Sequence, residues 1–186
     1  MTTCRSGWMA KVKIATEWLS GCAGCHMSVL DLDERLVALT ELVEITSSPI
    51  TDLKHPHAVD VGIVEGAVAN TANVQVLKEM REQCKILIAL GDCACFGGIP
   101  SMRNSLSKEE CLRRAYVESD STVDGVVPDD EELASLLDSV KPAHEIVKVD
   151  LHVPGCPPSA DAIYYALSEL LAGRTPVLAG ENLRYD

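Results

Sequence analysis

Residues 85–98 read KILIALGDCACFGG, an apolar run that passes into a glycine-flanked pair of cysteines. The apolar part, residues 86–90, is short, rich in isoleucine and leucine, and followed by glycine, which predicts a buried strand. Similar runs elsewhere predict four more strands, at residues 12–18, 42–46, 59–64 and 146–153. Helical patterns occupy much of the remaining chain, at residues 28–39, 73–83, 108–116, 129–140 and 158–171.

This alternation of strands and helices predicts an α/β fold of the flavodoxin-like type, a doubly wound parallel sheet with helices on both faces and strand order 2-1-3-4-5. The chain has 186 residues, 47% of them hydrophobic, which suffices for the core of one ordinary domain. We therefore expect residues 1–186 to form a single domain. The polar, acidic stretch at about residues 100–145 is expected to be a helical excursion, with Asp129 and Glu132 in a capping-box pattern after Pro128.

Charge and composition exclude several classes of protein. Sixteen Lys and Arg against 28 Asp and Glu give a net charge of −12, and no basic cluster suggests binding to nucleic acid or to an anionic membrane. The N-terminus lacks a signal-peptide pattern, and no apolar run is long enough to span a membrane, so we expect a cytoplasmic protein. Eight cysteines in a reducing compartment favour metal binding or redox chemistry over disulfides.

Four cysteines follow the predicted ends of three different strands. Cys22 and Cys25 come after the first strand, Cys93 after residues 86–90, and Cys156 after the last. Because the carboxyl ends of parallel strands share one edge of the sheet, where open α/β sheets bind ligands, these thiols are expected to converge there. Four converging thiolates suit either a cubane iron–sulfur cluster or a tetrahedral zinc ion.

The residues around these cysteines favour the cluster. Each thiol has glycine nearby, in SGCAGCHMS, LGDCACFGGIP and VPGCPPSADA, and glycine lets main-chain N–H groups turn toward sulfur. Cys156 also precedes the last helix, whose N-terminus favours negative charge. A structural zinc site more usually consists of two CxxC pairs close in sequence, whereas this chain has one pair and two separate cysteines.

Three segments carry a resemblance to a known family: SGCAGCHMSVLDLDE at residues 20–34, GDCACFGG at residues 91–98 and PGCPPSADAIYYALSELLAG at residues 154–173. In order and context they resemble the proximal-cluster domain of nickel–iron hydrogenase small subunits, most of all those of the soluble NAD-reducing, bidirectional type. The resemblance extends from about residue 11 to residue 173.

The resemblance implies that Cys22, Cys25, Cys93 and Cys156 ligate one [4Fe–4S] cluster. It implies that the nickel–iron centre and hydrogen activation lie in a large-subunit partner, so that this chain acts as a subunit of a hydrogen dehydrogenase (H2:NAD+ oxidoreductase). Electrons would then pass to diaphorase subunits with further iron–sulfur clusters and FMN, where NAD is reduced. The sequence departs from the common pattern at Gly21, where many relatives have Glu. Many relatives also continue into a second domain with more clusters, whereas this sequence stops soon after the last predicted helix, so one cluster is expected.

Three other functions are alternatives to the hydrogenase small subunit. The cluster-bearing subunit of a respiratory NADH:quinone oxidoreductase has a similar terminal GCPP motif, but it typically has adjacent cysteines where this chain separates Cys22 from Cys25. The small subunit of an F420-linked hydrogenase would look similar but usually carries additional cluster domains. A zinc-stabilised binding protein without redox function is the third alternative.

Three further residues are expected at or near the ligand edge: Glu65, His26 and Cys95. Glu65 follows a strand at the ligand edge, so it could serve proton movement, orient main-chain amides next to the cysteines, or be structural. His26 is expected to cap the following helix rather than contact the cofactor, and Cys95 to pack near the site rather than ligate. An FMN contact at this edge is conceivable, although the first loop lacks phosphate-binding hydroxyls, and neither GxGxxG nor GxxxxGK[ST] occurs.

The remaining cysteines, histidines and acids are expected to have no role in the site. Ordinary thiols are predicted at Cys4, Cys84 and Cys111. His55 and His57 are interpreted as loop residues beside Pro56. The acidic residues of the first helix, which are expected to form a solvated face or a partner contact, are Asp31, Asp33 and Glu34.

Overall fold

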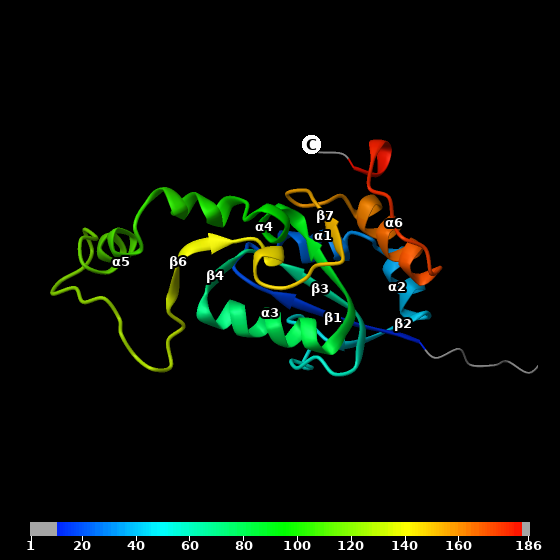
Figure 1. Cartoon of the computed structure of the whole chain (residues 1–186), viewed down its shortest axis with the longest axis horizontal. Coiled ribbons are helices and arrows are strands. Elements are labelled where there is room, and N and C mark those ends of the chain that lie inside the picture. The colour runs from blue at the N-terminus through cyan, green and yellow to red at the C-terminus, as the bar shows by residue number, and fades with distance from the viewer. Residues whose placement is uncertain (1–10, 184–186) are drawn as a thin grey trace, which may run out of the picture.

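Five parallel strands form the central sheet of this protein, described by a computed structural model over residues 11–183 (Figure 1). The strands are β1 (Val12–Trp18), β2 (Val43–Ser47), β3 (Val59–Glu65), β5 (Cys84–Leu90) and β7 (Leu151–Val153). Their order is β2-β1-β3-β5-β7, and every neighbouring pair is parallel. Counted within this sheet, the order is the predicted 2-1-3-4-5, and the predicted flavodoxin-like, doubly wound architecture is confirmed.

Both faces of the sheet are buried, because successive side chains of a strand point to opposite faces. In β5, Leu87 and Ala89 belong to one apolar cluster, whereas Ile88 and Leu90 belong to the other. The strands therefore read as continuous apolar runs in the sequence and not as alternating patterns. This is the property that made them recognisable.

Helices cover each face of the sheet. On one face, α3 (Thr71–Gln83) places Leu77 and Met80 in the cluster that contains Leu87. On the other face, α6 (Ala160–Leu171) places Ile163 and Leu167 in the cluster that contains Ile88. Two short helices, α1 (Gly24–Leu30) and α2 (Glu34–Thr40), follow β1, and α2 contributes Leu39 to the second cluster.

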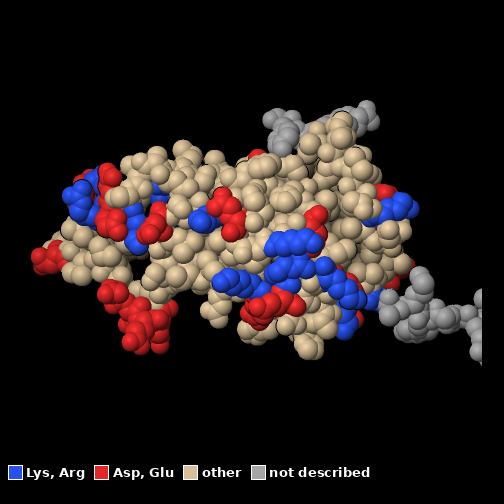
Figure 2. Space-filling model, in the orientation of Figure 1, with Lys and Arg blue, Asp and Glu red and all other residues tan. Residues whose placement is uncertain are grey.

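A second, smaller sheet anchors the excursion between β5 and β7. Its antiparallel strands are β4 (Val68–Asn70) and β6 (Leu136–Lys141). Between β5 and β6 lie α4 (Gly91–Phe96), the 3-10 helix η1 (Ile99–Ser105) and α5 (Lys108–Tyr116), and α5 projects away from the central sheet in Figure 1. The segment that returns from α5 to β6 has acidic residues and no Lys or Arg from residue 115 to residue 140, and Figure 2 shows acidic atoms gathered on this projecting part.

Two of the predicted elements in and after the excursion are wrong. The expected helix at residues 129–140 is absent: the Glu132 N–H bonds the Asp130 side chain at 2.8 Å, and β6 follows, because pairing with β4 outweighs the local helical pattern. The expected strand at residues 146–153 is reduced to β7. Its first residues pack instead as turns after a short 3-10 helix, η2 (Ala143–Glu145), with the Val147 N–H bonded to the Ala143 carbonyl at 3.1 Å.

Smaller differences concern the ends of helices. The expected helix at residues 28–39 is divided into α1 and α2, and Asp33 between them has a φ of 51°. The last helix begins at Ala160, where the Ser159 hydroxyl accepts from the Ala162 N–H at 3.2 Å. A final 3-10 helix, η3 (Gly180–Asn182), ends the described chain. No helix between residues 11 and 183 has the length and apolar character that would let it cross a membrane.

Candidate functional site

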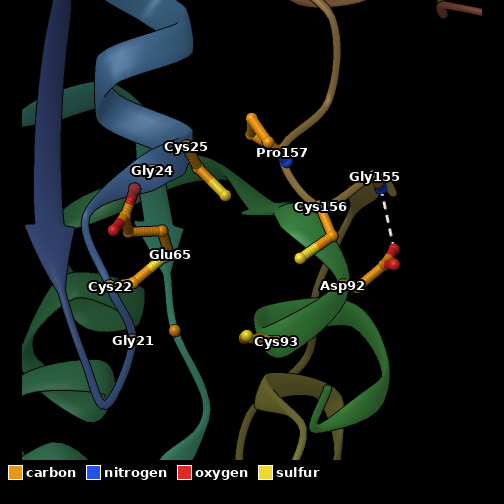
Figure 3. Close-up of a pocket in the computed structure, with 11 residues that line it drawn as sticks. Gly21, Cys22, Gly24, Cys25, Glu65, Asp92, Cys93, Gly155, Cys156 and Pro157 are labelled. Atoms are coloured by element: carbon orange, nitrogen blue, oxygen red, sulfur yellow. Dashed lines mark hydrogen bonds between the residues drawn. The ribbon is translucent and has the colours of Figure 1, made fainter. Parts of the chain in front are cut away.

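A pocket lies at the carboxyl ends of β1, β3, β5 and β7. The four predicted thiols line it together with glycines and two carboxylates: the lining residues are Gly21, Cys22, Gly24, Cys25, Glu65, Gly66, Asp92, Cys93, Gly155, Cys156 and Pro157. Figure 3 shows the sulfur atoms directed toward a common space from three separate segments of the chain. The parallel sheet brings these segments together because all of its strands end at this edge.

The first pair of cysteines lies in the loop between β1 and α1. This loop is fixed against the end of β3, because the main chains of Ser20 and Ala67 exchange two hydrogen bonds, of 2.9 and 2.7 Å. Ala23 then takes a left-handed conformation with φ of 64° and begins α1. Cys22 is exposed and Cys25, in the first turn of α1, is partly buried, so the two thiols reach the pocket from different depths.

The second pair consists of Cys93 in α4 and Cys156 in the loop between β7 and α6. Two hydrogen bonds join these segments: the Asp92 N–H donates to the Gly155 carbonyl at 2.8 Å, and the Gly155 N–H donates to the Asp92 carboxylate at 2.7 Å. Asp92 and Gly155 each directly precede a cysteine of the pocket. The relative position of Cys93 and Cys156 therefore depends on this contact, which Figure 3 shows.

Gly91 lets the two halves of the site approach each other. It has φ of +83°, and a Cβ atom at this position would overlap the Sγ atom of Cys25. Only glycine combines this conformation with so close an approach of main chain to sulfur. The glycine that begins the GDCAC segment is therefore required by the geometry of the pocket.

Glu65 connects the end of β3 to the helix that carries Cys25. Only 2% of the residue is exposed, and its Oε2 atom accepts from the His26 N–H at 2.6 Å and lies 2.7 Å from His26 Nδ1. His26 is inside α1, is 3% exposed, and packs edge-on against Trp18. Its Nε2 atom has no hydrogen-bond partner among residues 11–183. The prediction that His26 caps a helix is wrong: the cap position is Ala23.

Burial opposes ionisation of two of the pocket thiols, Cys25 and Cys93. The pKa of Cys25 is raised strongly, first by burial and then by the Glu65 carboxyl and the other three thiols of the pocket. Burial also raises the pKa of Cys93. A positively charged centre would offset this cost, because metal binding deprotonates thiols.

The size of the pocket and the spread of its donors bear on what it could hold. Its volume of about 60 Å³ is several times the roughly 10–15 Å³ that one water molecule needs. Across residues 11–183, no three His, Cys, Asp or Glu side chains come close enough together to hold a single metal ion. Four soft sulfur donors around a space of this size therefore fit a polynuclear iron–sulfur group better than one zinc ion.

Other predicted residues lie outside the pocket. Cys95 is fully buried and its thiol lies 3.4 Å from the Ala89 carbonyl, which agrees with a packing role. Cys84 packs in the core and Cys111 lies on α5, whereas Cys4 falls outside the described residues. Five further residues are exposed and do not line the pocket, as predicted: His55, His57, Asp31, Asp33 and Glu34.

Asp92 is the residue of the site that sequence reasoning missed. Its position next to Cys93 was visible in GDCAC, but an acidic residue next to a thiol gives no sign of its partner. That partner, Gly155, is 63 positions away along the chain. Only the pairing of β5 with β7 brings the two together.

Comparison with known proteins agrees with this geometry. The family model described as NADH ubiquinone oxidoreductase, 20 Kd subunit, matches residues 22–170, a span that contains all four thiols of the pocket. The delta subunit of the NAD-reducing hydrogenase HoxS of Cupriavidus necator is 44% identical to this chain over 180 residues, which cover 95% of this chain and 86% of that protein. The chain belongs to the NADH ubiquinone oxidoreductase, 20 Kd subunit, family.

Solved structures and further relatives support the same family membership. A chain in the crystal structure of an NAD+-reducing [NiFe]-hydrogenase is 45% identical, with a TM-score of 0.92 over 95% of this chain and 100% of that one. One subunit of the F420-non-reducing hydrogenase of Methanothermobacter thermautotrophicus is 40% identical over 93% of this chain, which spans only 58% of that protein. The predicted resemblance and the predicted class, a subunit of a hydrogenase-type oxidoreductase, are confirmed.

Proposed function

We propose that this chain is the electron-transfer small subunit of a cytoplasmic NAD-reducing nickel–iron hydrogenase and holds one [4Fe–4S] cluster on Cys22, Cys25, Cys93 and Cys156. The observation that carries the proposal is the pocket, in which thiols from three strand ends surround one space. A cluster bound there supplies one-electron transfer. The two electrons that a partner's nickel–iron centre takes from H2, as it releases two protons, then leave singly toward NAD+.

Exposed apolar side chains near the pocket support docking of a large subunit. Trp18 ends β1, Met27 lies in α1, Phe96 ends α4, and all three are more than two-fifths exposed, at 41%, 52% and 61%. Ile99 and Met102 of η1, the element that follows α4, are exposed as well. Apolar side chains that gather beside a site commonly mark a protein interface, and a partner there would cover the two exposed thiols, Cys22 and Cys156.

Glu65 is proposed as a residue that orients the main chain next to a ligand. Its carboxylate holds the N–H of His26, the residue after Cys25, and so fixes the first turn of α1 above the pocket. This contact favours the amide-orienting role over a purely structural one. A role of Glu65 in proton movement stays a prediction.

One alternative function, the respiratory one, differs from this proposal in a testable way. The family model takes its name from a respiratory NADH:ubiquinone oxidoreductase subunit, so the respiratory function shares the family. The relatives of 40% identity and above are hydrogenase subunits, which favours the hydrogenase. An FMN contact at this edge is not part of the proposal, because the four thiols line the pocket there and the first loop, SGCAGC, lacks a hydroxyl-rich phosphate-binding pattern.

Co-purification tests the partners and the final acceptor. The tagged chain is purified anaerobically from its native host, the accompanying subunits are identified, and hydrogen-dependent NAD reduction is assayed. We expect a nickel-containing large subunit and diaphorase subunits with iron–sulfur clusters and flavin. Recovery with quinone-reductase subunits and without nickel would contradict the hydrogenase function and favour the respiratory one.

Cysteine variants test the ligand set. Cys93→Ala in the same complex is expected to lose the cluster, measured as iron and acid-labile sulfide per chain and as the brown colour of the protein. Cys111→Ala on α5 is the matched control, because it removes a thiol outside the pocket, and it is expected to keep the cluster. Equal cluster content in the two variants would refute the assignment of Cys93.

A further inference from the structure

Asp92 makes a two-sided contact with the segment before Cys156. Its main-chain N–H donates to the Gly155 carbonyl, and its carboxylate accepts from the Gly155 N–H, at 2.8 and 2.7 Å. Cys93 and Cys156 are the next residues in each segment. The contact closes a small ring between α4 and the β7–α6 loop, in addition to the short pairing of β5 with β7.

The strand pairing alone does not fix this part of the pocket. The pairing of β5 with β7 ends at Leu90 and Val153, so α4 and the β7–α6 loop both leave the sheet before their cysteines. In the β7–α6 loop, the Gly155 N–H donates to the Asp92 carboxylate and so links this loop to α4. Loss of the carboxylate would leave this N–H without its partner at the side of the pocket.

Among residues 11–183, no Lys or Arg forms an ion pair with the Asp92 carboxylate. Between residues 11 and 183, each Lys or Arg found in an ion pair has another acid as its partner, and Asp92 is in none of these pairs. It nevertheless lines the pocket, and Figure 3 shows it next to Cys93 and Cys156. An unpaired carboxylate at this position acts on any charge that the pocket holds, because a partly buried site screens charge weakly.

We propose that Asp92 is a positioning residue. The hydrogen bond from the Gly155 N–H to its carboxylate, here called the strap, fixes the position of the Cys156 thiol relative to the Cys93 thiol. The inference rests on the proposed function for what those thiols hold, but the strap itself belongs to this chain. The same carboxylate lowers the reduction potential of a bound cluster, since its negative charge disfavours the added electron. Two separate effects follow, one on the position of the thiols and one on the electrostatic environment of the cluster.

Two substitutions separate these effects in the purified hydrogenase complex. Asp92→Ala removes both the acceptor and the charge, and it should lose iron to a chelator about tenfold faster, the lower end of the usual effect of residues that orient metal ligands. Asp92→Asn keeps an oxygen that can accept from Gly155 and removes only the charge. It should hold iron like the unsubstituted complex, with a higher reduction potential in a titration followed by electron paramagnetic resonance.

Hydrogen exchange provides a measurement independent of the cluster. The Gly155 amide should exchange faster in Asp92→Ala than in the unsubstituted complex, and at the unsubstituted rate in Asp92→Asn. Asp161→Ala is the matched control, because it removes an aspartate with an 87% exposed side chain from the helix that follows Cys156. It should change neither exchange at Gly155 nor iron loss.

The outcomes distinguish this inference from the proposed function. Unchanged exchange at Gly155 and unchanged iron loss in Asp92→Ala would overturn the strap. Iron loss in Asp92→Asn as fast as in Asp92→Ala would also overturn it, because charge rather than position would then be responsible. An unsubstituted complex whose small subunit holds no iron and no labile sulfide would refute the proposed function, and exchange at Gly155 would still decide whether the strap exists.

Discussion

The two edges of the central sheet use carboxylates in the same way but in different surroundings. At the amino edge, Asp60 accepts from the Lys13 N–H at 2.9 Å and pairs with Lys85, and Asp150 accepts from the Leu87 N–H at 2.9 Å and pairs with Arg81. At the carboxyl edge, Glu65 and Asp92 also accept from main-chain N–H groups, but among the described residues neither pairs with Lys or Arg.

The difference separates a stabilising edge from a functional one. A carboxylate with a cation beside it contributes modestly to stability, because the pair is largely neutral and solvated. A carboxylate without a cation leaves its charge acting on the pocket, and a buried one such as Glu65 depends entirely on its hydrogen bonds. Substitutions at the carboxyl edge should therefore affect the site most, and those at the amino edge should affect only stability.

The largest effect is expected at Gly91. Gly91→Ala places a methyl group where the Cys25 Sγ atom lies and imposes an unfavourable φ of +83°. We expect almost complete loss of iron from the complex, measured as iron and sulfide per small subunit. Gly173→Ala is the matched control, because Gly173 has φ of +71° but nothing within 4 Å of an added Cβ atom. Iron content that falls equally in both would show that backbone strain, rather than contact with Cys25, decides the outcome.

A smaller effect, on stability as well as on the site, is expected at Glu65. Glu65→Ala leaves the buried N–H and the Nδ1 atom of His26 without their partner, which costs about 2 kcal/mol in the free energy of unfolding. Glu65→Gln keeps an acceptor and should recover most of that loss while raising the reduction potential of the cluster. Urea unfolding of the small subunit within the complex measures the first quantity. If Glu65→Gln were as unstable as Glu65→Ala, charge rather than hydrogen bonding would hold α1 in place.

The smallest effect is expected at the amino edge. The Lys85 ammonium group, with help from the Lys13 N–H, lowers the pKa of Asp60 below its ordinary value. Because the folded pKa is the lower one, this contribution is present above about pH 4 and is lost as the pH falls through the folded pKa. Asp60→Asn should therefore cost only about 0.5 kcal/mol near neutral pH and nothing in strong acid, without changing iron content. Thermal unfolding against pH measures this, and a loss of iron in this variant would abolish the distinction between the edges.

The sequence predicted those parts of the fold that depend on burial. Continuous apolar runs such as residues 86–90 identified the central strands, because a strand covered on both faces has no polar alternation. The convergence of the four thiols followed from the parallel arrangement alone. Neither inference required knowledge of any particular side-chain contact.

The errors occur where a distant partner decides the local structure. Residues 136–140 have a helical composition but pair with β4, and Asn104 of η1 also bonds Val140 in both directions, at 2.9 and 2.7 Å. His26 was expected to cap a helix, whereas a carboxylate 39 positions away determines its place. Asp92 was missed for the same reason. A local pattern cannot report a partner that only the completed fold supplies.

The distribution of the four thiols along the chain has a consequence for biosynthesis. Cys22 and Cys25 leave the ribosome early, but Cys156 follows β7, the last strand of the sheet. The pocket therefore does not exist until nearly the whole chain has been synthesised and β7 has paired with β5. If the pocket holds the proposed cluster, all four thiols can bind it only after Cys156 has been synthesised, and a chain truncated before β7 would have an incomplete set of thiols.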